Sequence, residues 1–283
     1  MAKVMITGSD GFIGKYLHQK LPGCNVVAFD ANDGDIVEHK FSESEVVHVF
    51  HLAAKTSVPD SWENPREFYR VNVLGTTNIL EYCRRIGASM TYVNSYPYGI
   101  PLYNPIDEAH PCIPHSVYNH SKHLAEDICR FYAAHYNVPI TVFRLFNVFG
   151  GGQRTNFLIP HIVKQALFSS HIEVMDLAPK RDYTYIADVV EAIRLSIGLK
   201  GFNEYNVGSG ESKSVGEICN HVLTILCDQK PILSLDNKRK NEVPDIIADI
   251  SKINNELGWK PTTSFDEGLR NTIHYYQQER GKI

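Results

Sequence analysis

The sequence has 283 residues, of which 43% are apolar, and a formal net charge of −4 at pH 7. A chain of this length can bury a large core, and its acidic balance argues against nucleic acid or an anionic membrane surface as a partner. No apolar run approaches the ~20 residues of a membrane span, so we expect a soluble, cytoplasmic protein. No two of the six cysteines form a Cys-x-x-Cys pair. This spacing fits a reducing compartment, and it predicts neither a disulfide framework nor a bound metal.

The first strand-like run, residues 3–7, leads directly into a glycine-rich turn that contains Gly8, Gly11 and Gly14. Glycine suits such a turn because one position bends tightly, one lets backbone N–H groups approach a pyrophosphate, and one lets the next helix lie close to the strand. The helix then directs its positive dipole end at the phosphates. The sequence therefore predicts a dinucleotide-binding turn that includes Phe12 and Ile13.

Asp30 closes the second apolar run. A carboxylate at this place accepts hydrogen bonds from the adenosine ribose hydroxyls and repels a 2′-phosphate, so it favours NAD over NADP. A solvated turn residue is the alternative for Asp30. The compact segment that follows is expected to pass over the adenine, which makes Asp35 and Ile36 cofactor-binding candidates.

Strand-like and helical patterns alternate along the first half of the chain. Apolar runs typical of strands occupy 3–7, 25–30, 46–52, 89–95 and 139–145, and helical periodicity occupies 12–21, 65–86 and 116–136. This alternation predicts an α/β fold with a doubly wound parallel sheet covered by helices on both faces. Ligands of such sheets bind at the carboxyl ends of the strands.

A proline-rich stretch interrupts this alternation between Pro97 and Pro114. It excludes a helix or central strand there and predicts a long ordered loop next to the site. Beyond Phe146 the alternation weakens. We therefore expect residues 1–150, with a return segment about 183–200, to form the NAD-binding domain, and residues 151–283 to form mainly a smaller α/β substrate-binding domain.

Tyr118 and Lys122 lie one turn apart on the same face of the helix predicted over 116–136. A phenol whose pKa is lowered by a nearby ammonium can exchange a proton with a substrate hydroxyl or carbonyl near neutral pH. A second pair with this spacing, Tyr16 and Lys20, lies in the first helix. It comes too early in the chain for catalysis, and we interpret it as structural.

These motifs resemble those of the extended short-chain dehydrogenase/reductases, specifically the NAD-dependent nucleotide-sugar epimerase/dehydratase family. The resemblance covers nearly the whole chain. The other segments that carry it are 51–55, 72–78, 98–99, 144–150, 181–183, 249–252 and 257–259. It implies a Rossmann-type fold, NAD as cofactor, a nucleotide-diphosphate sugar as substrate, and a homodimer formed through the helical patterns at 65–86 and 116–136.

The resemblance also implies roles for individual residues. Tyr118 would be the acid/base, and Lys122 would hold the nicotinamide ribose and lower the pKa of Tyr118. The further cofactor-binding residues that it implies are Leu52, Ala53, Ala54, Lys55 and Asn72. The implied substrate-binding residues are Asn147, Arg181 and Arg239 at phosphate, Phe157 at the nucleotide, and Glu242 at the nucleotide ribose. Structural alternatives are a buried side chain for Asn72, a core residue for Phe157, and solvated charges for Arg181 and Arg239.

Two departures from the family pattern narrow the reaction. The family places Ser or Thr, whose hydroxyl bonds the reacting sugar oxygen, where this chain has Asn94. The Asn94 amide can still donate a hydrogen bond to that oxygen, so we expect it at the catalytic site, but it cannot relay a hydroxyl proton. Ser95 could supply the hydroxyl only if the strand end is shifted by one residue, and a structural role is its alternative. At 94–96 the family's dehydratases carry Thr-Asp-Glu, and its decarboxylases have Glu where this chain has Tyr96. The chain therefore lacks the carboxyl acid and base that dehydration needs.

The sequence thus predicts an enzyme, an NAD-dependent epimerase of a nucleotide-diphosphate sugar that works through a transient keto intermediate with Tyr118 as acid/base. An NAD(P)H-dependent 4-keto-sugar-nucleotide reductase would use the same residues and is an alternative. A non-catalytic dinucleotide-binding scaffold or sensor is the alternative of another class.

Overall fold

A computed structural model describes residues 2–237 and 243–279 of the chain. Contacts between Cα atoms divide the chain into two compact units. Unit 1 comprises Met1–Ile100, Glu108–Leu145 and Val190–Asn206, and unit 2 comprises Pro101–Asp107, Phe146–Val189 and Val207–Ile283.

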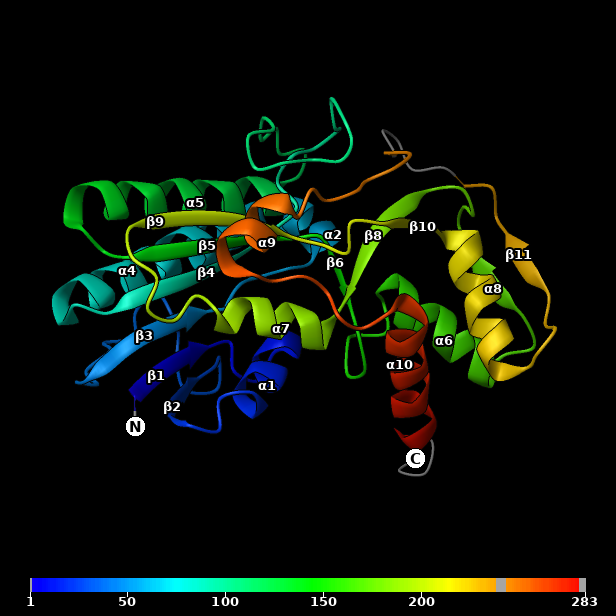
Figure 1. The fold of residues 1–283 in the computed structure, drawn as a ribbon, viewed down its shortest axis with the longest axis horizontal. Coiled ribbons are helices and arrows are strands. Elements are labelled where there is room, and N and C mark those ends of the chain that lie inside the picture. The colour runs from blue at the N-terminus through cyan, green and yellow to red at the C-terminus, as the bar shows by residue number, and fades with distance from the viewer. Residues whose placement is uncertain (1, 238–242, 280–283) are drawn as a thin grey trace. The chain divides into compact units, whose positions relative to one another are not determined.

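Unit 1 is built on a six-stranded sheet with the strand order β2-β1-β3-β4-β5-β9, in which the pairs β2-β1, β1-β3, β3-β4 and β4-β5 are parallel (Figure 1). Its strands are β1 (Ala2–Thr7), β2 (Cys24–Phe29), β3 (Val46–His51), β4 (Ser89–Ser95), β5 (Ile140–Leu145) and β9 (Phe202–Val207). Its helices are α1 (Phe12–Gln19), α2 (Val58–Glu63), α3 (Pro65–Tyr69), η1 (Arg70–Leu74), α4 (Gly75–Ile86) and α5 (Val117–Tyr136). Helix α7 (Ile186–Arg194) continues into this unit from unit 2.

All five strands expected from apolar runs are present, and the predicted α/β fold with a parallel sheet is confirmed. The sixth strand, β9, was not expected. It lies at an edge of the sheet, and three of its six residues, Asn203, Glu204 and Asn206, are polar, so it lacks the continuous apolar run of a strand buried on both faces.

The helix expected over 65–86 is divided into α3, the π-helix η1 and α4. A π-helix inserts a wide turn that apolar periodicity does not reveal, and such turns are frequent at functional sites. Helices α4 and α5 lie side by side and cover one face of the sheet, while α1 lies on the other side (Figure 1). Their buried residues, among them Leu80, Ala125 and Cys129, pack with sheet residues such as Val49 and Met90 into one core.

The proline-rich segment between β4 and α5 contains no helix or strand, as expected. Within unit 1, the Arg144 guanidinium donates 3.0 Å hydrogen bonds to the Tyr98 hydroxyl and to the Glu108 carbonyl. Tyr98 in turn donates to the Asn206 side chain at 2.5 Å. Tyr98 and Glu108 of this segment are therefore tied by hydrogen bonds to buried residues of the sheet.

Unit 2 holds a three-stranded sheet, β10-β8-β6, and a two-stranded sheet, β11-β7. Its strands are β6 (Asn147–Phe149), β7 (Ile172–Val174), β8 (Lys180–Tyr185), β10 (Ser212–Ser214) and β11 (Ile232–Ser234). Its other helices are α6 (Leu158–Phe168), α8 (Val215–Leu226), α9 (Ser251–Leu257) and α10 (Phe265–Glu279). Residues of α6, α8 and α10 pack together into a core of their own.

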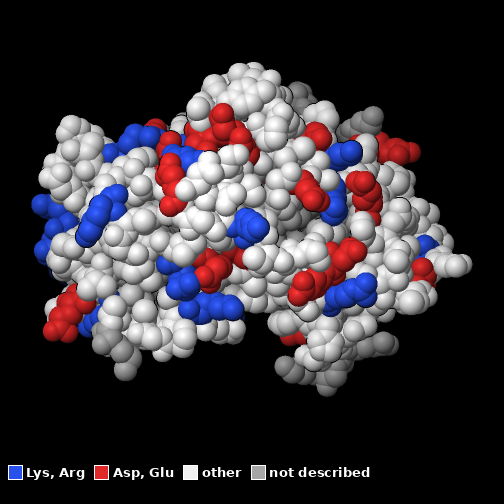
Figure 2. All heavy atoms as spheres, in the orientation of Figure 1, with Lys and Arg blue, Asp and Glu red and all other residues white. Residues whose placement is uncertain are grey.

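Lysine and arginine side chains are interspersed with aspartate and glutamate on the face shown in Figure 2. No helix in the described part of the chain is long and apolar enough to cross a membrane.

Candidate cofactor and catalytic site

The geometry of the glycine turn explains why Gly8 and Gly14 are glycines. Gly8 has a φ of +75°, and a Cβ atom there would lie 2.7 Å from the backbone nitrogen of Ala53. A Cβ atom on Gly14 would lie 2.2 Å from the carbonyl oxygen of Gly8. Gly11, with a φ of −67°, is less constrained and occupies the N-cap of α1.

The first turn of α1 is open to an anion. Gly11 has no side chain that could cap the helix, and the first turn contains no acidic residue. Backbone N–H groups at Phe12, Ile13 and Gly14 have no partner within the helix, because the first turn of any helix lacks one. This arrangement fits the pyrophosphate of a dinucleotide.

Gly14→Ala is expected to reduce NAD affinity by at least about 10-fold and to lower the free energy of unfolding by ~1–3 kcal/mol, because overpacking must displace the Gly8 carbonyl. Isothermal titration calorimetry with NAD measures the first effect, and urea denaturation measures the second. Gly23→Ala is the matched control, because a Cβ atom there meets nothing within 4 Å. Equal NAD affinity in both variants would contradict the assignment.

The structure brings Asp30 to the glycine turn. One carboxylate oxygen of Asp30 accepts the Asp10 N–H at 2.9 Å, and the other accepts the Ala31 N–H at 2.7 Å. The backbone N–H of Gly8 donates to the Phe29 carbonyl at 2.8 Å, which joins the ends of β1 and β2. A carboxylate held here fits the ribose of an adenosine moiety.

Asp35 and Ile36 have other partners in the structure. The Asp35 carboxylate lies 2.7 Å from the Arg70 guanidinium and accepts the Val37 N–H at 2.9 Å. The Val37 N–H, and then Arg70, lower the pKa of Asp35. Ile36 is buried in the core, where it contacts Gly75 at the start of α4. Contact of these two residues with adenine stays a prediction.

Buried hydroxyl groups join the ends of β1 and β3, a feature that the sequence analysis did not anticipate. The His51 ring lies 2.8 Å from the Thr7 hydroxyl through Nδ1 and 2.9 Å from the Thr76 hydroxyl through Nε2. The Thr76 hydroxyl donates its hydrogen to the Asn72 carbonyl at 2.7 Å, so it must accept the hydrogen bond from His51 Nε2. In the neutral ring Nδ1 then carries no hydrogen and accepts from the Thr7 hydroxyl. Burial, and then the charge of Lys122, lower the pKa of His51 to about 3, so the ring is neutral.

Next to this network, Leu52, Ala53 and Ala54 follow β3 as half-buried residues, and Lys55 is exposed. The amide of Asn72, in η1, fixes this segment: it accepts the Lys55 N–H at 2.8 Å and donates to the Lys55 carbonyl at 3.1 Å. It also donates to the Ser121 hydroxyl at 2.9 Å, and Ser121 donates to the Tyr118 carbonyl at 2.8 Å. Asn72 therefore connects the segment after β3 to the helix that carries Tyr118.

Tyr118 and Lys122 lie on α5, whose N-terminus is capped by the Ser116 hydroxyl. Lys122 is buried, and its ammonium lies 4.1 Å from the centroid of the Tyr92 ring. Burial lowers the pKa of Lys122 to about 7, although Cys129 and Glu126 oppose this shift. The Lys122 ammonium is thus easier to deprotonate than that of an exposed lysine.

The pKa of Tyr118 differs from the sequence-based expectation. Burial raises it above its ordinary value, and the Ser95 hydroxyl, not Lys122, opposes this rise. Desolvation acts on both groups of the Tyr-Lys pair and disfavours the charged form of each. Burial is therefore the larger influence on the pKa of Tyr118.

Lys122→Met is expected to stabilise the protein in a pH-dependent way. The pKa of Lys122 is about 7 in the folded chain and ~10.4 in an unfolded one. Between pH 7 and ~10.4, Lys122 is therefore protonated in the unfolded chain and mostly deprotonated in the folded chain. The contribution of Lys122 to the free energy of unfolding therefore rises with pH across this window and is least favourable below it.

Urea denaturation of Lys122→Met is expected to show a gain of ~1–3 kcal/mol at pH 6 and a smaller gain at pH 9. Lys20→Met, at an exposed lysine of the second Tyr-x-x-x-Lys pair, is the control and should change little. The same gain at both pH values would show that Lys122 does not titrate in this window.

Of the residues predicted to bind substrate, three lie in described parts of unit 2. Asn147 is exposed at the start of β6, and Phe157 is 44% exposed just before α6. Arg181, in β8, donates to the carbonyl groups of Lys180 and Val243, both at 2.7 Å. Arg239 and Glu242 lie outside the described residues.

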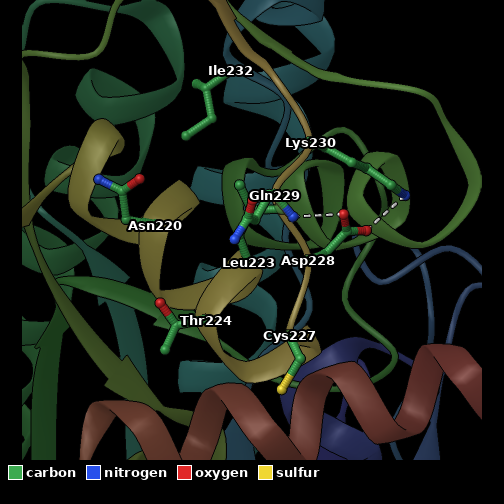
Figure 3. Close-up of a pocket in the computed structure, with 8 residues that line it drawn as sticks. All are labelled: Asn220, Leu223, Thr224, Cys227, Asp228, Gln229, Lys230 and Ile232. Carbon is green, nitrogen blue, oxygen red and sulfur yellow. Dashed lines mark hydrogen bonds and ion pairs between the residues drawn. The ribbon is translucent and has the colours of Figure 1, made fainter.

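Two cavities in unit 2 contain none of the predicted site residues. One, of about 710 Å³, lies at the end of α8 (Figure 3) and is lined by Asn220, Leu223, Thr224, Cys227, Asp228, Gln229, Lys230 and Ile232. Its two charged groups, Asp228 and Lys230, pair with each other at 3.4 Å. The other, of about 280 Å³, is bordered by β8 and the segment before α10. Among the described residues, no group of three or more His, Cys, Asp or Glu side chains could hold a metal ion.

The parallel sheet, the glycine turn before an uncapped helix and the Tyr-Lys pair on α5 define an NAD-dependent short-chain dehydrogenase/reductase. A family model described as GDP-mannose 4,6 dehydratase matches residues 22–272. The chain belongs to this family, that of the extended NAD-dependent nucleotide-sugar epimerases and dehydratases.

Similar proteins agree with this membership. A Methanocaldococcus jannaschii protein, named provisionally as a UDP-glucose 4-epimerase, is 31% identical over 96% of this chain and 97% of its own. The structure of the UDP-glucose 4-epimerase of Thermotoga maritima with UDP-glucose superposes on this chain with a TM-score of 0.92 and 26% sequence identity. The superposition covers 98% of this chain and 99% of the Thermotoga maritima chain.

A third relative, the UDP-glucose 4-epimerase of Thermus thermophilus solved with NAD, is 27% identical with a TM-score of 0.89 and covers 99% of this chain and 100% of its own. The predicted family, the Rossmann-type fold, the enzyme class and NAD as cofactor are confirmed.

Proposed function

We propose that this enzyme epimerises a UDP-hexose at C4. The observation that carries the proposal is the Tyr118 phenol, set beside the Ser95 hydroxyl and one turn from the buried Lys122. This arrangement provides one proton-transferring group. Oxidation of a secondary alcohol and its reversal need no more than that, whereas dehydration needs a further acid and base. The similarity to UDP-glucose 4-epimerases supports C4 as the reacting carbon.

In this mechanism, bound NAD supplies the hydride chemistry. Tyr118 takes the proton of the C4 hydroxyl as that carbon is oxidised and returns it when the other face of the keto sugar is reduced. Ser95 donates a hydrogen bond to the same sugar oxygen. Lys122 holds the nicotinamide ribose, and its charged form favours the Tyr118 phenolate.

The proposed contacts to the rest of the substrate come from arginine and amide groups. Asn147, Arg181 and Arg239 would bind the diphosphate, since a guanidinium presents planar, permanently charged donors to phosphate oxygens. Phe157 would border the base, and Glu242 would accept from the nucleotide ribose.

We also propose a homodimer formed through α4 and α5. Phe131 and Tyr136, on α5, are 53% and 48% exposed, and they offer apolar area for a symmetric interface. Size-exclusion chromatography with light scattering, compared between the wild type and Phe131→Lys, measures the oligomeric state. A monomeric wild type would overturn this part of the proposal.

The function is tested by incubating the purified chain with UDP-galactose and with UDP-glucuronate, and by separating the products chromatographically. Conversion of either sugar to its C4 epimer, together with NAD released from the denatured protein, is the expected result. Consumption of NADPH with a 4-keto-sugar nucleotide, without epimerisation, would favour the reductase. Bound dinucleotide without turnover of any of these would favour a scaffold or sensor.

A further inference from the structure

The end of β4 presents two neighbouring polar residues with different surroundings. The Ser95 hydroxyl interacts with the phenol of Tyr118 and lowers its pKa. Ser95 Oγ is buried, yet it makes no hydrogen bond of normal distance and angle within the described part of the chain. A buried hydroxyl without such a partner costs free energy, so Ser95 is held in place for a ligand by something other than its own side-chain contacts.

The side chain of Asn94 supplies that restraint. Asn94 is 2% exposed. Its Oδ1 accepts the backbone N–H of Ser95 at 2.8 Å, and its Nδ2 donates to a carboxylate oxygen of Glu126 at 2.6 Å. The amide thus uses an acceptor toward the strand and a donor toward α5. A serine or threonine hydroxyl at this position could not span both partners.

Glu126 is a rigid anchor for this amide. It follows Lys122 by four residues, as Lys122 follows Tyr118, so the three side chains share one face of α5. Glu126 is fully buried and forms an ion pair of 2.5 Å with Arg144. Burial acts to raise the pKa of Glu126, but the hydrogen bond and charge of Arg144 outweigh it and hold that pKa below its usual value.

We propose that Asn94 is a positioning residue that ties Ser95 to the face of α5 carrying Tyr118 and Lys122, so that Ser95 presents the hydroxyl to the reacting sugar oxygen. In place of the hydrogen bond to the sugar oxygen expected from the sequence, the Asn94 amide donates to Glu126 and accepts from the Ser95 N–H, and its side chain is buried away from the substrate. Asn94 therefore acts on the reaction only through Ser95. This inference rests on the proposed epimerase function.

The kinetic test compares Asn94→Ala, Ser95→Ala and the double variant as NAD-loaded enzymes. Each single change is expected to lower kcat for UDP-galactose by about 10–100-fold and to leave KM within about 3-fold. The double variant is expected to be no slower than Ser95→Ala, because Asn94 acts through Ser95. Losses that multiply in the double variant would overturn the proposal.

A matched control is Asn203→Ala, which removes an exposed amide bonded to the Lys200 carbonyl at 3.0 Å and should leave kcat unchanged. Asn94→Asp adds a second readout. Its new carboxyl can donate to Glu126 only when protonated, so kcat of this variant is expected to rise at least about 10-fold as the pH is lowered, unlike that of the wild type. A loss independent of pH would contradict the role of the donated hydrogen bond.

Amide hydrogen exchange at Ser95, measured without substrate, separates this inference from the proposed function. Asn94→Ala is expected to accelerate that exchange at least about 10-fold, while exchange at Phe143 within β5 stays constant. If the wild type turns over no UDP-sugar, the proposed function fails and this measurement still tests the restraint. Unchanged exchange at Ser95 would overturn the restraint even in an active epimerase.

Discussion

Tyr118→Phe is expected to lower kcat for the interconversion of UDP-sugars by ~10²–10⁴-fold, the usual contribution of a positioned acid/base. The substitution removes only the phenolic oxygen. The ring keeps its edge-to-face contact with Phe68, at 6.5 Å between centroids, so the fold and the bound NAD should be retained. The loss should appear in kcat with KM nearly unchanged, since the proton moves only during reaction.

Chromatographic assays of product measure this effect, and the absorbance of dinucleotide released by denaturation measures NAD content. Tyr16→Phe, in the other Tyr-x-x-x-Lys pair of the chain, is the matched control. Tyr16 contacts Phe12 within α1, and its variant should keep the rate within about 2-fold. If Tyr118→Phe retained the wild-type rate, Tyr118 would not be the acid/base.

Local patterns were sufficient to predict much of unit 1. Parallel strands buried on both faces require continuous apolar runs, and all five such runs became strands. The glycine turn could also be anticipated, because the close approaches of Gly8 and Gly14 leave no room for a side chain. Edge strand β9 and the π-helix η1 leave no comparable local signal, and both were missed.

The relation between Asn94 and Ser95 could not be found by counting residues. It depends on Glu126, and through it on Arg144, which belong to other elements of the fold. The pKa shifts likewise depend on burial, which raises the pKa of Tyr118 and lowers that of Lys122 and cannot be read from their spacing in the sequence. Membership of the family followed from the ordered motifs, which are local in the sequence.

Arg144→Met is expected to lower the free energy of unfolding by ~3–5 kcal/mol, because it leaves the buried charge of Glu126 with only the longer, 3.6 Å ion pair to the half-exposed Arg130. Arg144 is 3% exposed, and Glu126 is fully buried. The substitution also removes the donor to the Tyr98 hydroxyl and to the Glu108 carbonyl. Urea denaturation of the whole chain, monitored by hydrogen exchange at residues of β5, measures the loss.

The matched control is Arg84→Met, whose ion pair with Glu81 is about half exposed on both sides, at 45% and 43%, and which should cost less than ~1 kcal/mol. The double variant Glu126→Leu with Arg144→Met removes both charges and is expected to recover stability to within ~1–2 kcal/mol of the wild type. Its kcat should stay low, because Asn94 then has no carboxylate to hold it. If the double variant recovered both stability and turnover, the buried pair would serve the fold alone. If Arg144→Met lost less than ~1 kcal/mol of stability, the buried ion pair itself would be contradicted.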